Sequence, residues 1–309
     1  MSILSAPHFH NEEAAYAYVE ARLWPNGPIC PHCGGFERIG KMGGASTRIG
    51  TYKCYQCRKP FTVKVGTIFE ASHVPMRHWL QAMFLMASSK KGISANQLHR
   101  TLGCTLKTAW FIEHRLREAM RSGDLTPFGS GGGAVEADET FIGRRKGVPL
   151  PKGGIGHKMK VLSLLDRDTG AKRSVVIDNM EVATIAAVVN ANVAKEAHLM
   201  TDEAYHYGKI GEGFAAHGVV KHKAEEYVSR SNPFVHTNTI EGSFSIFKRG
   251  MRGVYQHCEE QHLHRYLAEF DFRYTHRIAL GMDDIARSDT LLAGVVGKRL
   301  TYRTTAGQA

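Results

Sequence analysis

The spacing of apolar residues along the chain changes close to residue 133. Before this point, Asn11 as an N-cap, two glutamates in the first turn and Pro25 after the end predict a helix over residues 11–23. After Pro75 the apolar residues recur every three or four positions, which is the spacing of one face of an α-helix. Beyond residue 133, residues 134–142 alternate between two kinds of side chain, as expected for a β-strand with two different faces. The pattern therefore predicts a helical front part and a back part that contains a sheet.

Two further helical patterns lie close together between residues 94 and 120. Ser94 precedes the first as an N-cap, Gly103 ends it, and Thr105 is the N-cap of the second. Helix, short glycine-containing turn, helix is typical of a helix-turn-helix motif that binds DNA, although plain helical hairpins share the pattern. We expect the second helix to expose the following residues: Lys107, Thr108, His114, Arg115 and Arg117.

Four cysteines form two CxxC pairs, Cys30 with Cys33 and Cys54 with Cys57, and twenty residues separate the pairs. Each CxxC turn directs two sulfur atoms at one point, so two such turns complete a tetrahedral cage for a structural Zn²⁺ ion. Phe61 and the apolar residues after it predict short strands beside the metal, which makes this segment a zinc ribbon. Unrelated redox pairs or disulfides are the alternative, and this spacing rarely produces them.

The back part has the element order of an α/β domain. After the strand 134–142, the pattern predicts further strands, then a helix, a strand and two final helices. The predicted strands are 158–166, 173–178 and 198–201, with 219–221 as a candidate fifth, and the predicted helices are 181–197, 239–249 and 259–275. This is the order of an RNase-H-like domain.

The predicted fold class is therefore multidomain: a small β zinc ribbon and an α helix-turn-helix, followed by an α/β RNase-H-like catalytic domain. Residues 123–133 contain five glycines and a proline, which is typical of a linker. The predicted parts are an N-terminal helical segment (1–27), the ribbon (28–70), the helix-turn-helix region (75–122), the linker (123–133), the catalytic domain (134–280) and a C-terminal tail (281–309).

The positive charge is concentrated in the front part. The chain carries a net charge of +11, and between residues 30 and 121 fifteen Lys and Arg oppose four Glu and no Asp. This distribution predicts that a polyanion such as double-stranded DNA binds there, and a solvated basic face is the alternative. No apolar stretch approaches the ~18 residues of a membrane span, and the N-terminus lacks a signal pattern, so we expect a cytoplasmic protein that binds no membrane.

Three acidic residues of the back part occupy positions that suit a metal site. Asp138 lies within the first strand, Asp202 directly follows a short apolar strand, and Glu241 lies early in a helix that carries Lys248 on the same face. Carboxylates from two strands and a helix suit Mg²⁺ or Mn²⁺, and such a site supports phosphoryl transfer. Each acid alone has an ordinary alternative as a helix cap, a first-turn acid or an exposed strand residue.

Several sequence blocks carry a resemblance to a known family. They are CPHC…CYQC with GTIF, VEADETFIG, TDEAYHY, and the long block that begins with HTNTIEGSF and ends with RYTHR. Over roughly residues 28–280 the chain resembles bacterial insertion-sequence DDE transposases of the ISXO-like group, which carry an N-terminal zinc ribbon. The resemblance implies an enzyme that binds terminal inverted repeats and target DNA as a homo-oligomer, associates with the nucleoid, and cleaves and joins strands with Mg²⁺ or Mn²⁺.

The resemblance also implies roles for individual residues. The metal-binding acids are Asp138, Asp202 and Glu241, accompanied by Lys248. Some relatives have Asn in place of the third acid, whereas this chain has Glu241. Asn238, three residues earlier on the same face, is therefore an auxiliary candidate. Glu139 and Glu203 are further auxiliary candidates, and the DNA-binding candidates are Lys107, Thr108, Arg115, Arg117, Arg249 and Arg252.

Two other function classes compete with a transposase. One is a DNA-binding regulator without catalysis, which would not need the acids that this chain retains. The other is a metal-dependent nuclease or resolvase of RNase-H type, which would cut DNA without joining it.

Overall fold

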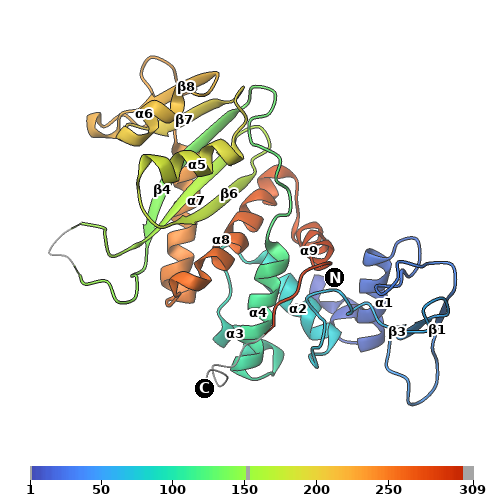
Figure 1. Cartoon of the computed structure of the whole chain (residues 1–309). Helices are drawn as coiled ribbons and strands as arrows, with labels where there is room; N and C mark the ends of the chain where they lie inside the picture. Colours follow the sequence, from blue (N-terminus) through green and yellow to red (C-terminus); the bar gives the residue numbers. More distant parts are fainter. Residues whose placement is uncertain (1, 151–153, 302–309) are drawn as a thin grey trace, which may run out of the picture. The chain divides into compact units, whose positions relative to one another are not determined.

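The computed structural model describes residues 2–150 and 154–301, which form two compact units (Figure 1). Unit 1 comprises residues 2–89, 93–121 and 282–301, and unit 2 comprises residues 90–92, 122–150 and 154–281. Within the described residues, no helix has the length and apolar character that crossing a membrane requires.

Unit 1 holds the small ribbon sheet and a set of helices. The three ribbon strands are antiparallel in the order β1-β2-β3. The elements are β1 (Ile39–Lys41), β2 (Tyr52–Cys54), β3 (Pro60–Phe61), α1 (Glu12–Leu23), α2 (Met76–Ser88), α3 (Ala95–Leu102), α4 (Leu106–Met120) and α9 (Asp284–Ala293). Trp24, directly after α1, packs edge-on against the rings of Tyr52 and Phe61, so an aromatic cluster joins this helix to the ribbon sheet.

The helical hairpin of unit 1 has the boundaries that its caps predict. The side chains of Ser94 and Thr105 each accept a hydrogen bond from a backbone N–H in the first turn of the helix that follows. Gly103 ends α3 with a φ angle of 64°, a left-handed conformation that glycine adopts without steric cost. The two predicted helices and the turn between them are therefore present, and their assignment as a helix-turn-helix motif that binds DNA stays a prediction.

The segment predicted as a C-terminal tail is folded as far as it is described. α9 packs on α2, buries Leu291 and Leu292 completely or nearly so, and is part of unit 1. The guanidinium of Arg287 donates a hydrogen bond to the carbonyl of Ala87 near the end of α2. The tail prediction for 281–309 was wrong for this helix because its apolar face becomes visible only against the α2 surface that it covers. Residues 302–309 lie outside the described residues.

Unit 2 is built on a five-stranded sheet in the order β6-β5-β4-β7-β8. β4 is central, antiparallel to β5 and parallel to β7. The strands are β4 (Ala134–Ile142), β5 (Met159–Asp166), β6 (Lys172–Ile177), β7 (His198–Asp202) and β8 (Ala216–Val220). The candidate fifth strand predicted at 219–221 is thus real and begins three residues earlier.

Helices cover both faces of this sheet (Figure 1). They are α5 (Val182–Asn192), α6 (Tyr205–Gly211), α7 (Asn238–Gly250) and α8 (Glu260–Thr275). Val135 and Ala137 of β4 join a core that includes residues of α5 and α6. Ile142 lies in another core with residues of α7 and α8, so alternation along β4 directs its odd and even positions to opposite layers.

Short turns complete the description of the chain. They are the 3₁₀ helices Ile3–Ser5, Pro7–Phe9, His222–Ala224 and Ile278–Leu280, and one π-helical turn, Met251–Tyr255, which continues from α7.

The glycine-rich segment 123–133 is packed in its second half rather than free. Phe128 is buried in the core of unit 2 and pairs with Val193 through an isolated β-bridge. Gly129 has a φ of 72°, and a Cβ there would lie 2.5 Å from the Cβ of Ala197. The linker prediction was therefore wrong for this half of the segment. Glycine gives the backbone conformational freedom, but it also lets the backbone pack closely against neighbouring residues, as it does here.

Candidate active site and zinc centre

The four cysteines of the ribbon converge on one point. The Sγ atoms of Cys30 and Cys57 are 3.6 Å apart, those of Cys33 and Cys54 are 3.7 Å apart, and all four lie within 4.8 Å of one another. These separations are far longer than the ~2.0 Å of a disulfide bond. They match a tetrahedron with Zn–S bonds of about 2.3 Å, whose sulfur atoms would be about 3.8 Å apart.

The second CxxC turn is shaped to hold a thiolate. The backbone N–H groups of Cys57 and Gln56 point at the sulfur of Cys54 and lower its pKa to about 7. A thiolate is the form that binds zinc, so the turn favours the charge state that a metal site requires. The predicted cage, the geometry of the four sulfur atoms and this turn therefore support a structural Zn²⁺.

The three predicted acids come from three elements of unit 2 that meet beside β4. Asp138 lies in the middle of β4, Asp202 ends the neighbouring parallel strand β7, and Glu241 lies in the first turn of α7. β4 and β7 are hydrogen-bonded neighbours, and α7 packs on β4. Glu136 pairs with Met200 in this parallel register, so Asp138 and Asp202 each lie two residues beyond the same pair on adjacent strands.

The electrostatics of Asp138 show that the three acids share one neighbourhood. Burial raises the pKa of Asp138 to about 8, and the charges of Glu139, Asp202 and Glu241 act in the same direction. The backbone N–H of Glu139 donates a hydrogen bond to Asp138 at 2.7 Å and opposes the shift. Crowded carboxylates raise one another's pKa, and a cation between them would relieve the repulsion.

The carboxylates are more widely spaced than the four sulfur atoms. Within residues 2–150 and 154–301, the cysteines are the one group of three or more potential ligands whose atoms all lie within 4.8 Å. The acid set therefore does not form a closed cage.

Glu241 is already held by two side chains that the sequence did not single out. Its Oε1 accepts a hydrogen bond from the hydroxyl of Thr237 at 2.9 Å and lies 3.2 Å from Nε2 of His222. Thr237 is the N-cap residue of α7, whereas His222 begins a 3₁₀ turn nineteen positions before Glu241. No periodic pattern marks His222, so the sequence offers no signal for this contact.

Glu139 connects β4 to α6 and thereby to the loop that follows Asp202. Its Oε1 accepts a hydrogen bond from the hydroxyl of Tyr207 at 2.6 Å and lies 3.1 Å from Nε2 of His206. Burial and the charge of Glu139 raise the pKa of Tyr207 well above its usual value, which keeps the phenol protonated as a donor. This position supports the auxiliary role predicted for Glu139.

Lys248 lies within the electrostatic field of the acids. Burial, followed by the charge of Arg252, lowers its pKa, while Asp138 acts in the opposite direction. Asn238 is exposed at the start of α7, and Glu203 is half-buried in the turn before α6. The structure therefore brings Lys248 to the site and leaves the auxiliary roles of Asn238 and Glu203 as predictions.

Comparison with known proteins finds matches to both parts of the chain. A family model described as ISXO2-like transposase domain matches residues 131–275, and one described as transposase zinc-ribbon domain matches residues 10–60. The chain thus carries an ISXO2-like transposase domain and a transposase zinc ribbon. It is also 28% identical over 284 residues, 86% of this chain and 91% of the other, to an uncharacterized protein in transposable element ISH50 of Halobacterium salinarum.

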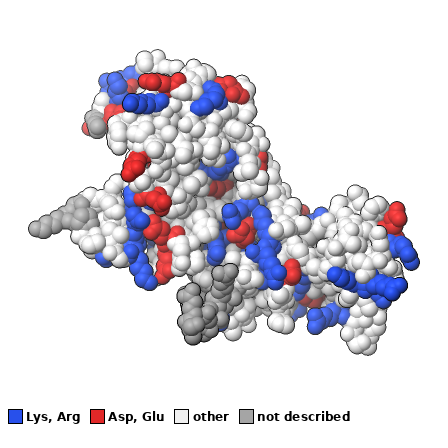
Figure 2. All heavy atoms as spheres, viewed as in Figure 1, with Lys and Arg blue, Asp and Glu red and all other residues white. Residues whose placement is uncertain are grey.

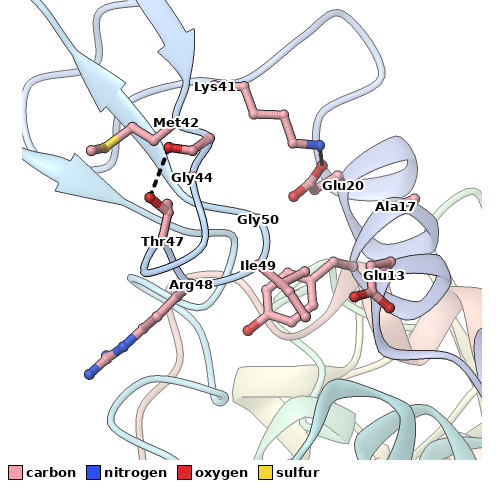
Figure 3. A pocket seen from close by; sticks show the side chains of 12 residues that line it. Glu13, Ala17, Glu20, Lys41, Met42, Gly44, Thr47, Arg48, Ile49 and Gly50 are labelled. Atoms are coloured by element: carbon pink, nitrogen blue, oxygen red, sulfur yellow. Dashed lines mark hydrogen bonds and ion pairs between the residues drawn. The ribbon is translucent and has the colours of Figure 1, made fainter.

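The zinc-ribbon match begins before the ribbon itself, in agreement with the packing of α1. A hollow of about 230 Å³ lies between α1 and residues 41–50, and Lys41 and Glu20 form an ion pair of 4.0 Å across it (Figure 3). A Cβ at Gly50, whose φ is 68°, would lie 2.4 Å from the ring of Tyr16. Glycine is required there, and α1 is part of the same module as the ribbon.

Two of the predicted DNA-binding residues are internal. Arg117 is fully buried and pairs with Glu113 at 3.1 Å. Arg115 is 4% exposed and donates to the backbone carbonyls of Ile68 and Glu70. The DNA-binding prediction for these arginines was wrong because α4 is covered on nearly every side.

The same burial corrects the expectation that His114 is exposed. Lys107, at the start of α4, is exposed, and Thr108 is half-buried. Arg249 and Arg252, which follow Lys248, are exposed as well. Figure 2 shows Lys and Arg side chains on the surface of the ribbon at the right of the view, where Arg48 extends away from α1 (Figure 3). The DNA-binding roles of these residues stay predictions.

Proposed function

We propose that this protein is a transposase that binds the terminal inverted repeats of its insertion sequence and cleaves and joins DNA strands at the site formed by Asp138, Asp202 and Glu241. The observation that carries the proposal is the placement of the three acids on neighbouring elements: Asp138 lies on β4, Asp202 ends the adjacent strand β7, and Glu241 lies in the first turn of α7, which packs on β4. A group of partly buried acids on adjacent elements is costly without a cation and is typical of functional sites.

The arrangement of unit 2 supports an RNase-H-like domain. Its first three strands are antiparallel neighbours, its last two are parallel, and the sheet order is β6-β5-β4-β7-β8. That is the order expected for such a domain with the first acid on the central strand.

Asp138, Asp202 and Glu241 are the residues that would hold Mg²⁺ or Mn²⁺, since these cations prefer carboxylate oxygens and retain some water ligands. The open spacing of the three acids suits such partly hydrated cations. The ions would activate the attacking oxygen and neutralise charge on the phosphate. Lys248 would contact a phosphate oxygen beside the scissile bond, since it lies near enough to Asp138 for the two charges to interact.

The reaction consists of two exchanges at phosphorus. In the first, a water oxygen attacks the phosphorus at the end of the element, and the P–O3′ bond breaks to give a 3′-hydroxyl and a 5′-phosphate. In the second, that 3′-hydroxyl attacks a phosphodiester of target DNA and displaces its 3′-oxygen. One phosphodiester replaces another in the joining step, so it needs neither a covalent enzyme intermediate nor an external energy source.

DNA recognition is assigned to unit 1 and to the rim of the acid site. The exposed N-terminal end of α4, with Lys107 and Thr108, is the part of a second helix that enters the major groove in helix-turn-helix proteins. Arg249 and Arg252 would bind the phosphates next to the scissile bond. We further propose that the protein acts as a homo-oligomer, because both ends of the element must be held together while they are joined to one target DNA.

One assay separates this function from its two competitors. The full-length protein with its zinc is incubated with labelled terminal-repeat DNA, a target plasmid and Mg²⁺. A transposase gives labelled ends joined covalently to the plasmid, a nuclease or resolvase gives cut ends alone, and a regulator gives binding without cleavage. Retention of all three acids and Lys248 favours the first outcome.

A further inference from the structure

Glu136 is a buried carboxylate that the proposed reaction does not use. It lies two residues before Asp138, so both side chains leave β4 on the same face. Its side chain is 0% exposed. One oxygen accepts a hydrogen bond from Nε of Arg167 at 2.6 Å, and the other accepts one from the backbone N–H of Ile240 at 2.8 Å.

These two partners belong to different parts of unit 2. Arg167 lies in the turn that follows β5, and Ile240 lies in the first turn of α7. The first N–H groups of a helix have no partner within the helix, and an anionic acceptor there is favourable. Glu136 therefore joins the start of α7 directly to the strand that carries Asp138.

Arg167 holds the chain segment that leads into α7. Its guanidinium donates to the carbonyl oxygen of Phe234 at 2.6 Å and to that of His236 at 2.5 Å, and lies over the Phe234 ring. It also lies 2.9 Å from Nδ1 of His236. Burial and the neighbouring Arg167 charge lower the pKa of His236, which favours a neutral ring that accepts this hydrogen bond.

We propose that Glu136 and Arg167 form a clamp that positions Glu241 opposite Asp138. The proposal rests on the function proposed above, because it concerns the placement of the third acid. Glu241 directly follows Ile240, whose N–H the clamp holds, so a shift of this helical turn displaces Glu241 relative to β4. Arg167 compensates the charge of Glu136, so the clamp fixes the helix without adding an unpaired anion beside Asp138.

Glu136 and Arg167 are positioning residues, since neither would touch DNA or a cation. Groups that orient metal ligands typically change metal affinity by about 10- to 100-fold when they are replaced. A purely structural role would lower the stability of unit 2 and leave the affinity of the folded protein unchanged. Metal affinity therefore distinguishes positioning from simple stabilisation.

The test uses full-length, zinc-loaded protein and the variants Glu136→Gln and Arg167→Gln. Asp271→Asn is the matched control, since Asp271 forms a buried ion pair of its own with Lys172, at 3.4 Å, between α8 and β6. Binding of Mn²⁺ is measured from the loss of the free-ion electron paramagnetic resonance signal. Hydrogen exchange of the amides in residues 238–243 is measured on the same samples, below the melting temperature of each variant.

We expect both clamp variants to raise the Kd for Mn²⁺ by about tenfold and to accelerate exchange in residues 238–243, with the control within about twofold of wild type. Unchanged affinity in both clamp variants, or an equal loss in Asp271→Asn, would overturn the clamp. If Glu136→Gln does not fold, Arg167→Gln decides the question alone. Wild-type protein that binds Mn²⁺ but neither cuts nor joins terminal-repeat DNA would refute the proposed function. The clamp would still be tested separately, by the Mn²⁺ affinities of its variants.

Discussion

Nε2 of His222 lies 3.2 Å from Oε1 of Glu241, and the hydroxyl of Thr237 donates to the same oxygen. Two residues outside the acid triad thus hold one oxygen of the third acid in a fixed direction. This contact gives the third acid a defined orientation, which a residue in the first turn of a helix would otherwise lack.

Replacing His222 by Ala should therefore raise the Mg²⁺ concentration that catalysis requires and change DNA binding much less. We expect the Mg²⁺ concentration for half-maximal cleavage to rise by about tenfold, because the orientation of Glu241 is lost. Tyr227→Phe is the control, since the Tyr227 ring lies beside His222 and Phe retains it. An equal rise in both variants, or none in His222→Ala, would show that the contact is incidental.

The zinc centre should be separable from the acid site. Cys57→Ser removes one of the four sulfur ligands, so the purified protein should lose its stoichiometric zinc and bind terminal-repeat DNA weakly. Unit 2 should stay folded because its core contains no part of the ribbon. Metal analysis and circular dichroism measure the two effects. If metal analysis finds no zinc in pure wild-type protein that has not been exposed to a chelator, the zinc assignment is wrong.

Buried and exposed cations of α4 should behave differently. Arg117→Ala leaves the buried Glu113 carboxylate without this partner, and breaking such a pair typically costs about 3–5 kcal/mol of unfolding free energy. Lys107→Ala should leave the melting temperature unchanged. It should instead weaken DNA binding and reduce the log–log salt slope by about 0.9 if the lysine neutralises one phosphate.

Denaturant unfolding and DNA titrations at several salt concentrations measure the two effects. A Lys107→Ala protein with wild-type affinity and slope would remove this residue from the DNA surface. A fully stable Arg117→Ala protein would contradict the structural role of the buried pair.

The ionised carboxylate of Asp138 should lower the free energy of unfolding when no divalent cation is added. Its pKa is about 8 in the folded protein against an ordinary value of 3.8, so the folded state retains a proton that the unfolded state releases between these pH values. The free energy of unfolding attributable to this group therefore falls as the pH rises through that window, and the full penalty remains above about pH 8.

Asp138→Asn removes the penalty. In thermal melts without added Mg²⁺, the melting temperature of the variant should rise relative to that of wild type from pH 5 to pH 9. Added Mg²⁺ should raise the melting temperature of wild type alone. If the melting temperature of the variant instead falls relative to that of wild type as the pH rises, the predicted sign of the Asp138 contribution is wrong.

Local signals in the sequence predicted most of the elements. Ser94, Gly103 and Thr105 define helix ends through their own hydrogen bonds or backbone angles, and the structure confirms them. The bounds of β4 were likewise predicted correctly, since its alternation reflects the two faces of one strand. The convergence of the four cysteines follows from a spacing that few other structures produce.

Contacts made only by tertiary packing were missed. Arg117 looked like an exposed cation on a helix, and only the neighbours of α4 show that it is buried. Glu136 appeared as one more polar strand residue, although its partners Arg167 and Ile240 lie far along the chain. His222 reaches Glu241 from an irregular turn, for which no period exists.

The most direct measurement is joining of labelled terminal-repeat DNA to a target plasmid with Mg²⁺, compared between wild type and Asp138→Asn, Asp202→Asn and Glu241→Gln. We predict that each substitution lowers cleavage and joining at least about 100-fold, or about 2.7 kcal/mol, and leaves end binding nearly intact. Double variants should be no worse, because one loss already disables the shared site.

Lys248→Ala, Glu139→Gln and Glu203→Gln should retain partial activity in the same assay, since they support the site without holding the cation. Wild-type activity in Glu241→Gln would move the third ligand elsewhere, with Asn238 as the next candidate. Full joining by Asp138→Asn, or no joining by wild type under conditions where it binds the ends, would contradict the proposed active site.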